Sequence, residues 1–267
     1  MTRTLSLAHL TVLDHAPPEM VHLAARLGYD AVGLRLIRVS DATPGYPLHD
    51  DPAALRATLA ALDATGLPVL DIEFVRIVPG FRAADLARFL DAGAALGARH
   101  VICAPYDPDP GRLAGNLAAL QALAEARGLS CVLEFFPWTD VPDLAACRRV
   151  VQAAGPGVGM LVDALHFDRS SSRLADLAAL PPDLLPFAHL CDAPVCPPYA
   201  TEALLHAGRA ERLPPGEGQI DLRGWLAALP AGIPLALEVP MAGLAAAQGS
   251  AAVAARVLAA ARALLAA

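Results

Sequence analysis

The chain has 267 residues, of which 55% are hydrophobic and 18% are charged, which is enough for one large globular domain or two small ones. Its 20 basic residues are all arginine, so the sequence excludes Schiff-base catalysis by lysine, attachment of a pyridoxal cofactor and a Walker-type phosphate loop. The formal net charge of −7 and the lack of a basic cluster argue against a nucleic-acid partner, because phosphate binding needs clustered cations.

Short apolar runs alternate with longer alanine- and leucine-rich stretches of helical period along the whole chain. The apolar runs predict strands at 4–9, 30–36, 68–74, 100–104, 130–135, 157–162, 187–191 and 234–239. The periodic stretches predict helices at 17–27, 52–65, 83–96, 111–127, 142–153, 173–180, 222–229 and 249–266. The apolar tail at 242–267 is mostly alanine and contains arginines, which predicts an amphipathic helix and no membrane span.

The alternation of strand and helix indicates a repeated βα unit of roughly 33 residues. Several helices end in a glycine that directly precedes a strand, as at Gly28 and Gly66, and glycine readily takes the left-handed conformation that ends a helix. Eight such units predict a closed (β/α)₈ TIM barrel. An open doubly wound sheet is the competitor, but its G-x-G-x-x-G turn is absent. No linker divides the chain, so residues 1–267 are predicted to form a single barrel domain.

Four consecutive predicted strands end in ionisable residues: Glu134, Asp163, His189 and Glu238. In a TIM barrel the active site lies at the carboxyl ends of the strands, so these side chains are expected to meet there. Each follows apolar residues, and a lone carboxylate in such a buried place is costly unless it is paired or bound to a metal. Three carboxylates and one imidazole suit Mn²⁺, Mg²⁺, Co²⁺ or Zn²⁺. The alternative is that each is a buried polar residue with an ordinary hydrogen-bond partner.

The segments around these residues carry a family resemblance. They read Leu-Glu-Phe-Phe-Pro at 133–137, Val-Asp-Ala-Leu-His-Phe at 162–167, His-Leu-Cys-Asp-Ala at 189–193, Leu-Glu-Val-Pro at 237–240 and Pro-Gly-Glu-Gly-Gln-Ile-Asp at 215–221. Together they resemble the xylose isomerase-like TIM-barrel superfamily, which includes inosose isomerases, inosose dehydratases and ketose 3-epimerases. The resemblance covers nearly the whole chain.

The resemblance implies one divalent metal ion, with Mn²⁺ expected and Mg²⁺, Co²⁺ or Zn²⁺ as alternatives. The implied ligands are Glu134, Asp163, His189 and Glu238. The resemblance also suggests that His166 and one of Arg209 and Arg212 contact the substrate, because a guanidinium can bind oxygen atoms bidentately. The alternative for each arginine is an exposed side chain on an irregular segment.

Further substrate contacts are predicted from position alone. Arg169 lies on the loop after the sixth strand, and Glu73 ends the third strand. For Glu73 a salt bridge to Arg76 or Arg35 is the alternative. Phe136 and Trp138, just after Glu134, could form an apolar wall against the face of a sugar ring or could pack in the core.

This set of residues suits proton transfer beside a carbonyl, because a divalent ion stabilises the enediolate that forms. We expect Glu134 and Glu238 to act as base and acid, which gives an isomerase or epimerase of a keto-sugar, polyol or inosose. Expulsion of a β-hydroxyl would instead give a dehydratase of the inosose or dehydroshikimate type. A non-catalytic sugar-binding barrel is the third interpretation.

The cysteines bear on the cellular compartment. They are Cys103, Cys131, Cys147, Cys191 and Cys196. An odd number without a C-x-x-C pair predicts reduced thiols in a cytoplasm. The first apolar run is interrupted by His9 and Asp14, which favours a strand over a signal peptide. By family analogy a homo-oligomer is expected.

Overall fold

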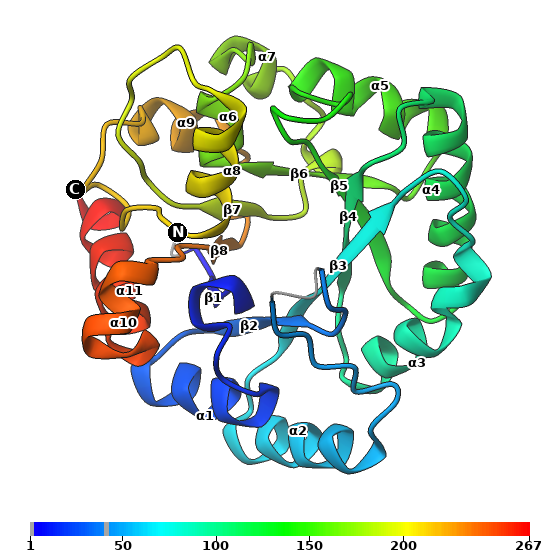
Figure 1. Cartoon of the computed structure of the whole chain (residues 1–267), viewed down its shortest axis with the longest axis vertical. Helices are drawn as coiled ribbons and strands as arrows, with labels where there is room; N and C mark the ends of the chain where they lie inside the picture. The colour runs from blue at the N-terminus through cyan, green and yellow to red at the C-terminus, as the bar shows by residue number, and fades with distance from the viewer. Residues whose placement is uncertain (1–2, 40–42) are drawn as a thin grey trace.

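The computed structural model describes residues 3–39 and 43–267, in which strands and helices alternate along the chain (Figure 1). The strands are β1 Leu5–Leu7, β2 Ala31–Arg35, β3 Val69–Ile77, β4 His100–Pro105, β5 Ser130–Glu134, β6 Gly159–Asp163, β7 Ala188–Leu190 and β8 Leu235–Leu237. The α-helices are α1 Pro17–Leu27, α2 Pro52–Thr65, α3 Ala87–Ala95, α4 Pro110–Glu125, α5 Leu144–Ala154, α6 Ala164–Asp168, α7 Leu174–Ala178, α8 Thr201–Arg209, α9 Leu222–Ala228, α10 Ala242–Gln248 and α11 Ser250–Ala266. Short 3₁₀ helices are η1 His9–Val12, η2 Ala83–Leu86 and η3 Pro182–Leu184.

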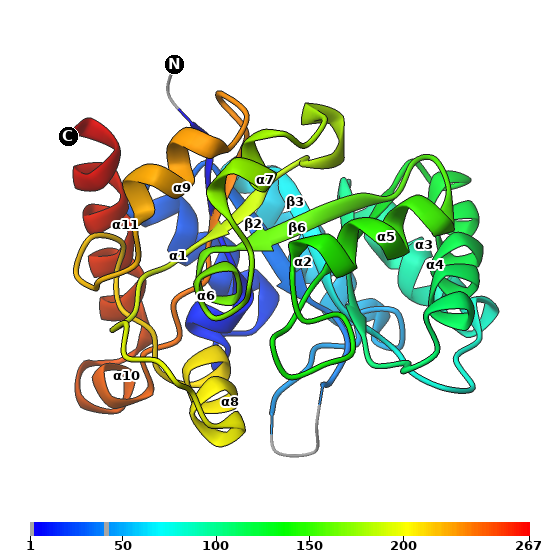
Figure 2. The same ribbon diagram turned by 90° about the horizontal axis from the view of Figure 1, so that it is seen from above.

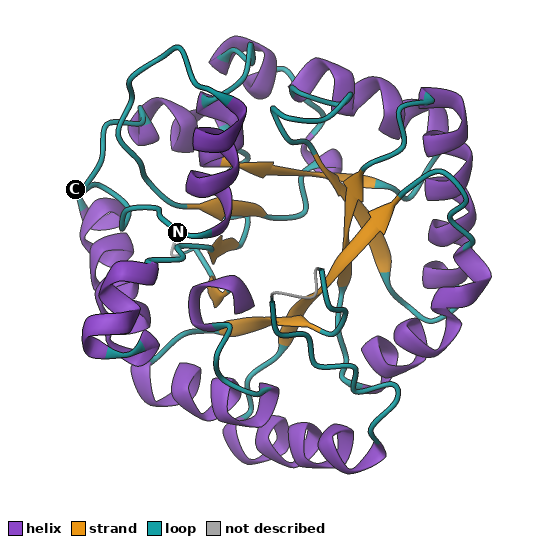
Figure 3. Cartoon of the chain, in the orientation of Figure 1, coloured by secondary structure: helices purple, strands orange, loops and turns teal. Residues whose placement is uncertain are grey.

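The strands form a closed parallel barrel. Each strand pairs with the next along the chain, and β8 pairs with β1 in the register Leu5 to Leu235 and Leu7 to Leu237. Figure 3 shows the strands inside a ring of helices. The predicted (β/α)₈ barrel is therefore confirmed, and all eight predicted strands are present.

Three short helices depart from the expected pattern. α6, α8 and α10 follow β6, β7 and β8 and were not predicted as separate elements. Figure 2 shows α8 and α10 at the same end of the barrel. Helices this short span too few turns for a hydrophobic period to be visible in the sequence. The predicted helix at 83–96 is instead divided into η2 and α3.

The barrel interior is filled in layers because alternate residues of a strand point inwards. One apolar layer contains Val132, Leu161, Phe187 and Ala236, which pack together inside the barrel. Two residues further along β5, β6, β7 and β8 come the ionisable residues that the sequence singled out. Strand alternation therefore turns all four towards the axis at the same end.

The terminal helix agrees with its prediction. α11 is a 17-residue helix, and Val253, Val257 and Ala261 are on its buried side. Within residues 3–39 and 43–267, no helix combines the length and the apolar character needed to cross a lipid bilayer.

Candidate metal centre

Four side chains converge at the carboxyl ends of β5 to β8, and we call them the quartet: Glu134, Asp163, His189 and Glu238. One ligand atom from each lies within 4.8 Å of the other three. His189 Nδ1 lies 3.5 Å from Glu134 Oε1, 3.7 Å from Asp163 Oδ2 and 3.5 Å from Glu238 Oε2. All four side chains are buried. The structure therefore brings together the residues that the sequence suggested as metal ligands.

The quartet has the chemistry of a divalent-cation site. Glu134 Oε1 and His189 Nδ1 are buried and have no hydrogen-bond partner among the described residues. Buried polar atoms normally have partners, and separations near 3.5 Å are too long for ordinary hydrogen bonds. Oxygen and imidazole nitrogen atoms that converge without bonding to one another are the donors that Mn²⁺, Mg²⁺, Co²⁺ or Zn²⁺ use. The residues present therefore fit such an ion.

Arg212 lies against the quartet and is almost fully buried. Its Nη1 lies 2.6 Å from Asp163 Oδ2, and its Nη2 lies 2.8 Å from Glu238 Oε2. The guanidinium also donates to the backbone oxygens of Glu238 and Gly208, each at 3.0 Å. Arg212 therefore forms ion pairs with two of the three carboxylates and lines the pocket above them.

The surroundings shift the pKa values of the quartet residues in different directions. Burial raises the pKa of Glu134 to about 7, and the Glu238 and Asp163 carboxylates add to this shift while His189 opposes it. Burial also disfavours the charged form of Glu238, but Arg212 and His189 outweigh it and lower the pKa of Glu238 to about 2. Burial alone would lower the pKa of His189, but the surrounding carboxylates raise it well above its usual value. The two glutamates therefore differ widely in proton affinity.

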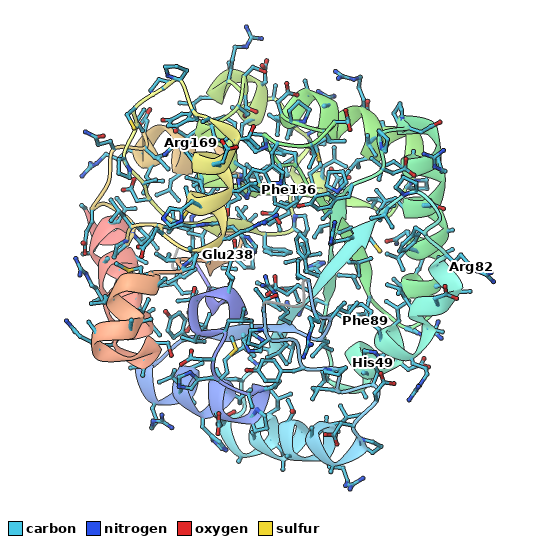
Figure 4. The ribbon with its side chains drawn as sticks, viewed as in Figure 1. His49, Arg82, Phe89, Phe136, Arg169 and Glu238 are labelled. Atoms are coloured by element: carbon cyan, nitrogen blue, oxygen red, sulfur yellow. The ribbon has the colours of Figure 1, made fainter. Side chains whose placement is uncertain are left out.

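A pocket of about 240 Å³ opens over the quartet and has an aromatic wall. The wall contains Phe74, Tyr106, Phe136 and Trp138. Phe136 stacks on Trp138 with ring centroids 5.2 Å apart. Both residues predicted to face a substrate ring therefore line the pocket. In Figure 4, Glu238 and Phe136 lie towards the middle of the ring of helices, whereas Arg82 lies at its outer edge.

His166 lies between the aromatic wall and the quartet. Its ring packs edge-on against Phe136 and Trp138, with centroids at 4.8 and 5.1 Å, and its Nε2 lies 3.9 Å from Glu134 Oε1. Asp163 Oδ1 caps α6 by accepting from the backbone of His166 at 3.2 Å, which explains the three-residue spacing between the two. Burial lowers the pKa of His166 to about 4, so its imidazole is neutral.

The other residues predicted to contact the substrate lie in three different surroundings. Arg209 is exposed at the end of α8 and lines the pocket, on a helix where an irregular segment was expected. Glu73 is buried and pairs with Arg35, whose Nε lies 3.2 Å from Glu73 Oε1, so its alternative interpretation as a salt bridge is confirmed. Arg169 pairs with Asp168, lies over the ring of Tyr199 and does not line the pocket.

Two pocket residues were missed by the sequence interpretation. Arg76 lies beyond the predicted end of the third strand, but β3 continues to Ile77 and carries Arg76 into the pocket lining. Tyr106 directly follows β4 and also lines the pocket. Both lie two residues beyond the predicted ends of the third and fourth strands, at 74 and 104. A search for functional residues at strand ends would have found them if it had extended two residues further.

A family model described as a xylose isomerase-like TIM barrel matches residues 21–261 of the chain. Among solved structures, a xylose isomerase-like TIM barrel/4-hydroxyphenylpyruvate dioxygenase fusion protein has a TM-score of 0.79 and 22% identity to this chain. The match covers 97% of this chain and 42% of the fusion protein, so the chain spans less than half of that protein. No protein of curated function matches the sequence.

Two other solved structures cover nearly the whole chain. The IOLI protein with a bound zinc atom has a TM-score of 0.79 and 17% identity, over 96% of both chains. The 3-keto-D-glucoside 4-epimerase YcjR from E. coli has a TM-score of 0.71 and 17% identity, over 97% of this chain and 100% of that one. At these identities the likeness shows a shared fold.

Proposed function

The chain belongs to the xylose isomerase-like TIM-barrel family, and from this premise we propose that it is a divalent-metal-dependent isomerase or epimerase. Its proposed substrate is a keto-sugar, a polyol or an inosose. The observation that supports the proposal is the quartet, whose four ligand atoms lie within 4.8 Å of one another under an open pocket. The proposed ion is Mn²⁺, and Mg²⁺, Co²⁺ and Zn²⁺ are alternatives because carboxylate-rich sites accept several ions.

A divalent ion bound by the quartet would stabilise the negative charge that develops on a substrate oxygen when the neighbouring carbon loses its proton. Glu134 and Glu238 come from β5 and β8 and face the same pocket. One glutamate removes the proton and the other returns it. Return to the opposite face of the same carbon gives epimerisation, and return to the adjacent carbon gives isomerisation.

The surrounding residues support these proton transfers. Arg212 holds the Glu238 carboxylate from one side, 2.8 Å from Oε2. His166, neutral and 3.9 Å from Glu134 Oε1, is placed to hydrogen-bond a substrate hydroxyl beside that glutamate. The aromatic wall covers one side of the pocket and keeps water away from the reacting carbon.

The same loss of a proton could be followed by loss of a β-hydroxyl, which would make the protein a dehydratase. A barrel that only binds its ligand is the other alternative, and the presence of all four quartet residues argues against it. Product mass separates the enzymes, because elimination removes one water. Exchange of the proton with solvent separates an enzyme from a binding protein.

The test combines metal analysis with proton exchange. Protein loaded with Mn²⁺ and incubated with candidate ketoses in D₂O is expected to introduce deuterium at the carbon beside the carbonyl. Glu134→Gln and Glu238→Gln should each slow this exchange by roughly 100-fold or more, because each removes one proton-transfer group. Metal-free protein should be similarly slow.

The matched control is Glu125→Gln, an exposed glutamate at the end of α4 on the outer ring, which should exchange at the wild-type rate. Purified protein that takes up no divalent ion would contradict the proposal. Full activity in either quartet variant would refute the assignment of Glu134 and Glu238.

A further inference from the structure

Four arginines line the pocket over the quartet, and they differ in what they bind. They are Arg35, Arg76, Arg209 and Arg212. Arg35 pairs with the buried Glu73 at 3.2 Å, and Arg212 pairs with two carboxylates of the quartet. These two guanidinium groups are therefore neutralised within the protein.

Arg76 and Arg209 have no carboxylate partner within residues 3–39 and 43–267. Among the residues that the structure describes, Arg76 donates to the backbone oxygen of Val39 at 3.4 Å, and its guanidinium lies 4.5 Å from the centroid of the Tyr106 ring. Arg209 is exposed at the carboxyl end of α8. In the described part of the chain, the acidic residues that line the pocket are Glu134 and Glu238, and both belong to the quartet. Within residues 3–39 and 43–267, the mouth of the pocket therefore carries two arginines that no carboxylate neutralises.

The two arginines are connected by the aromatic wall. Arg76 lies over Tyr106, whose hydroxyl accepts a hydrogen bond from Trp138 Nε1 at 3.2 Å. Trp138 packs against Gly208, where an added Cβ would lie only 2.8 Å from Trp138 Cη2. Gly208 directly precedes Arg209. A continuous row of contacts thus runs along one side of the pocket, with a cation at each end.

We infer that the substrate is an anion, a hydroxy-ketone whose carboxylate or phosphate group is bound by Arg76 or by Arg209 on this side of the pocket while its carbonyl end reaches the quartet. This inference rests on the proposed function and narrows its substrate class. Guanidinium groups bind planar or tetrahedral oxyanions with paired hydrogen bonds, and the chain has no lysine to do so. A neutral keto-sugar, polyol or inosose would offer neither arginine a countercharge.

The test compares ligands that differ only in charge. D-fructose, D-fructuronate and D-fructose 6-phosphate share a hydroxy-ketone and differ at the far end of the molecule. Calorimetric titration of the Mn²⁺-loaded and the metal-free protein should give at least one anion a Kd about tenfold or more below that of D-fructose. This advantage should shrink as salt is added. The anion with the larger advantage distinguishes a carboxylate from a phosphate.

A double variant tests whether the tighter binding of the anion depends on Arg76 and Arg209. Arg76→Gln combined with Arg209→Gln should weaken binding of the anion about tenfold more than binding of D-fructose, which removes the advantage of the anion. Both side chains are exposed, so the variant should fold as the wild type does, which its melting curve checks. The control is Arg173→Gln, an exposed arginine paired with Asp176 outside the pocket, which should keep the advantage.

Four results would overturn the inference: equal affinities, tighter binding of D-fructose, no binding of either anion at millimolar concentration, or an advantage that survives in the double variant. Failure of the proposed function has a different readout, which is the loss of metal uptake or of deuterium exchange. Because anion binding is also measured without metal, the two failures are distinguishable.

Discussion

Arg212 explains why chemically similar carboxylates in the quartet behave differently. Its guanidinium reaches Asp163 at 2.6 Å and Glu238 at 2.8 Å. Burial of a carboxylate disfavours its charged form, and a nearby cation reverses that effect. The pKa of Glu238 is therefore lowered to about 2, whereas burial leaves the pKa of Glu134 raised to about 7. The reach of one side chain thus decides which glutamate holds a proton more tightly.

Replacement of this cation should destabilise the metal-free protein. In Arg212→Gln, two buried carboxylates lose their partner, and breaking a buried ion pair typically costs about 3–5 kcal/mol. We expect the free energy of unfolding, measured by urea denaturation with a chelator present, to fall by about that amount. A divalent ion should restore more stability to the variant than it adds to the wild type, because the ion replaces the missing charge.

The control for Arg212→Gln is Arg173→Gln, which breaks a surface ion pair with Asp176 and should change stability by less than about 1 kcal/mol. If Arg212→Gln unfolds at the same urea concentration as the wild type, Arg212 does not hold the quartet in place.

At the residue scale, the sequence predicted the members of the quartet but not their partners. Glu134 and Asp163 could be found because each directly ends an apolar strand. Arg212 could only be suggested as a substrate contact, because its carboxylate partners lie 49 and 26 residues away along the chain. Contacts of that kind depend on how loops fold back over the barrel, which strand periodicity does not determine.

At the scale of elements, one buried aspartate fixes the loop that carries the Pro-Gly-Glu-Gly segment. Asp192 follows β7, and its Oδ2 accepts from the backbone of Gly216 and of Gly218, each at 2.9 Å. Its Oδ1 accepts from the backbone of Ala193 at 2.8 Å and of Ile220 at 3.1 Å. A single carboxylate thus ties residues 213–221 to the end of β7, next to Arg212.

Asp192→Asn should loosen this loop. An amide has only one acceptor oxygen, so two backbone N–H groups would face its NH₂ group, and each buried unpaired group costs about 1–3 kcal/mol. We expect the free energy of unfolding to fall by about 2–6 kcal/mol on that basis, towards the lower end because both N–H groups are only partly buried. Amide hydrogen exchange at Gly216 and Gly218 should become faster, because these are the amides that lose their acceptor.

Asp221→Asn provides the matched control for this loop. Asp221 caps α9 by accepting from the backbone of Gly224 at 2.9 Å, and asparagine caps a helix about as well as aspartate. Its stability should therefore stay close to that of the wild type. Unchanged exchange at Gly216 and Gly218 in Asp192→Asn would show that the loop is held by other contacts.

The sequence predicts long helices more accurately than short ones. α1 and α2 begin and end where the sequence placed them, because proline at the first turn and glycine at the end mark both. α8 was missed although it carries Arg209, since nine residues give little periodic signal. β3 was predicted three residues too short, which hid Arg76. The helix and the strand end that the sequence did not predict therefore both contribute to the pocket, where loops and short helices replace the repeated βα pattern.

At the scale of the whole molecule, histidines at the two ends of the barrel have different charge states. In the metal-free protein, the carboxylates of the quartet raise the pKa of His189, at the carboxyl ends of the strands, well above its usual value. His100 begins β4 at the opposite end, where its Nδ1 lies 2.9 Å from Ser130 Oγ and its ring stacks on Phe187. Burial lowers the pKa of His100 to about 4, so it is neutral in the folded protein.

This neutral histidine should make folding sensitive to acid. In the unfolded chain a histidine titrates near 6.5, so between about pH 6.5 and the folded pKa of about 4 the unfolded state binds more protons. Stability contributed by His100 is therefore complete above about pH 6.5 and is lost as the pH falls towards 4. Between about pH 7 and pH 5 the loss amounts to about 2 kcal/mol.

His100→Asn keeps a polar group beside Ser130 but cannot be protonated, so it should flatten this pH dependence. We expect urea unfolding of metal-free protein to show a fall in stability between about pH 7 and pH 5 that is smaller in the variant by about 2 kcal/mol. The variant also loses the stacking on Phe187, so the slope with pH is the diagnostic quantity and the absolute stability is not. His22→Gln, at an exposed position on α1, should keep the wild-type slope. Equal slopes in His100→Asn and the wild type would mean that burial does not lower the pKa of His100 in the folded barrel.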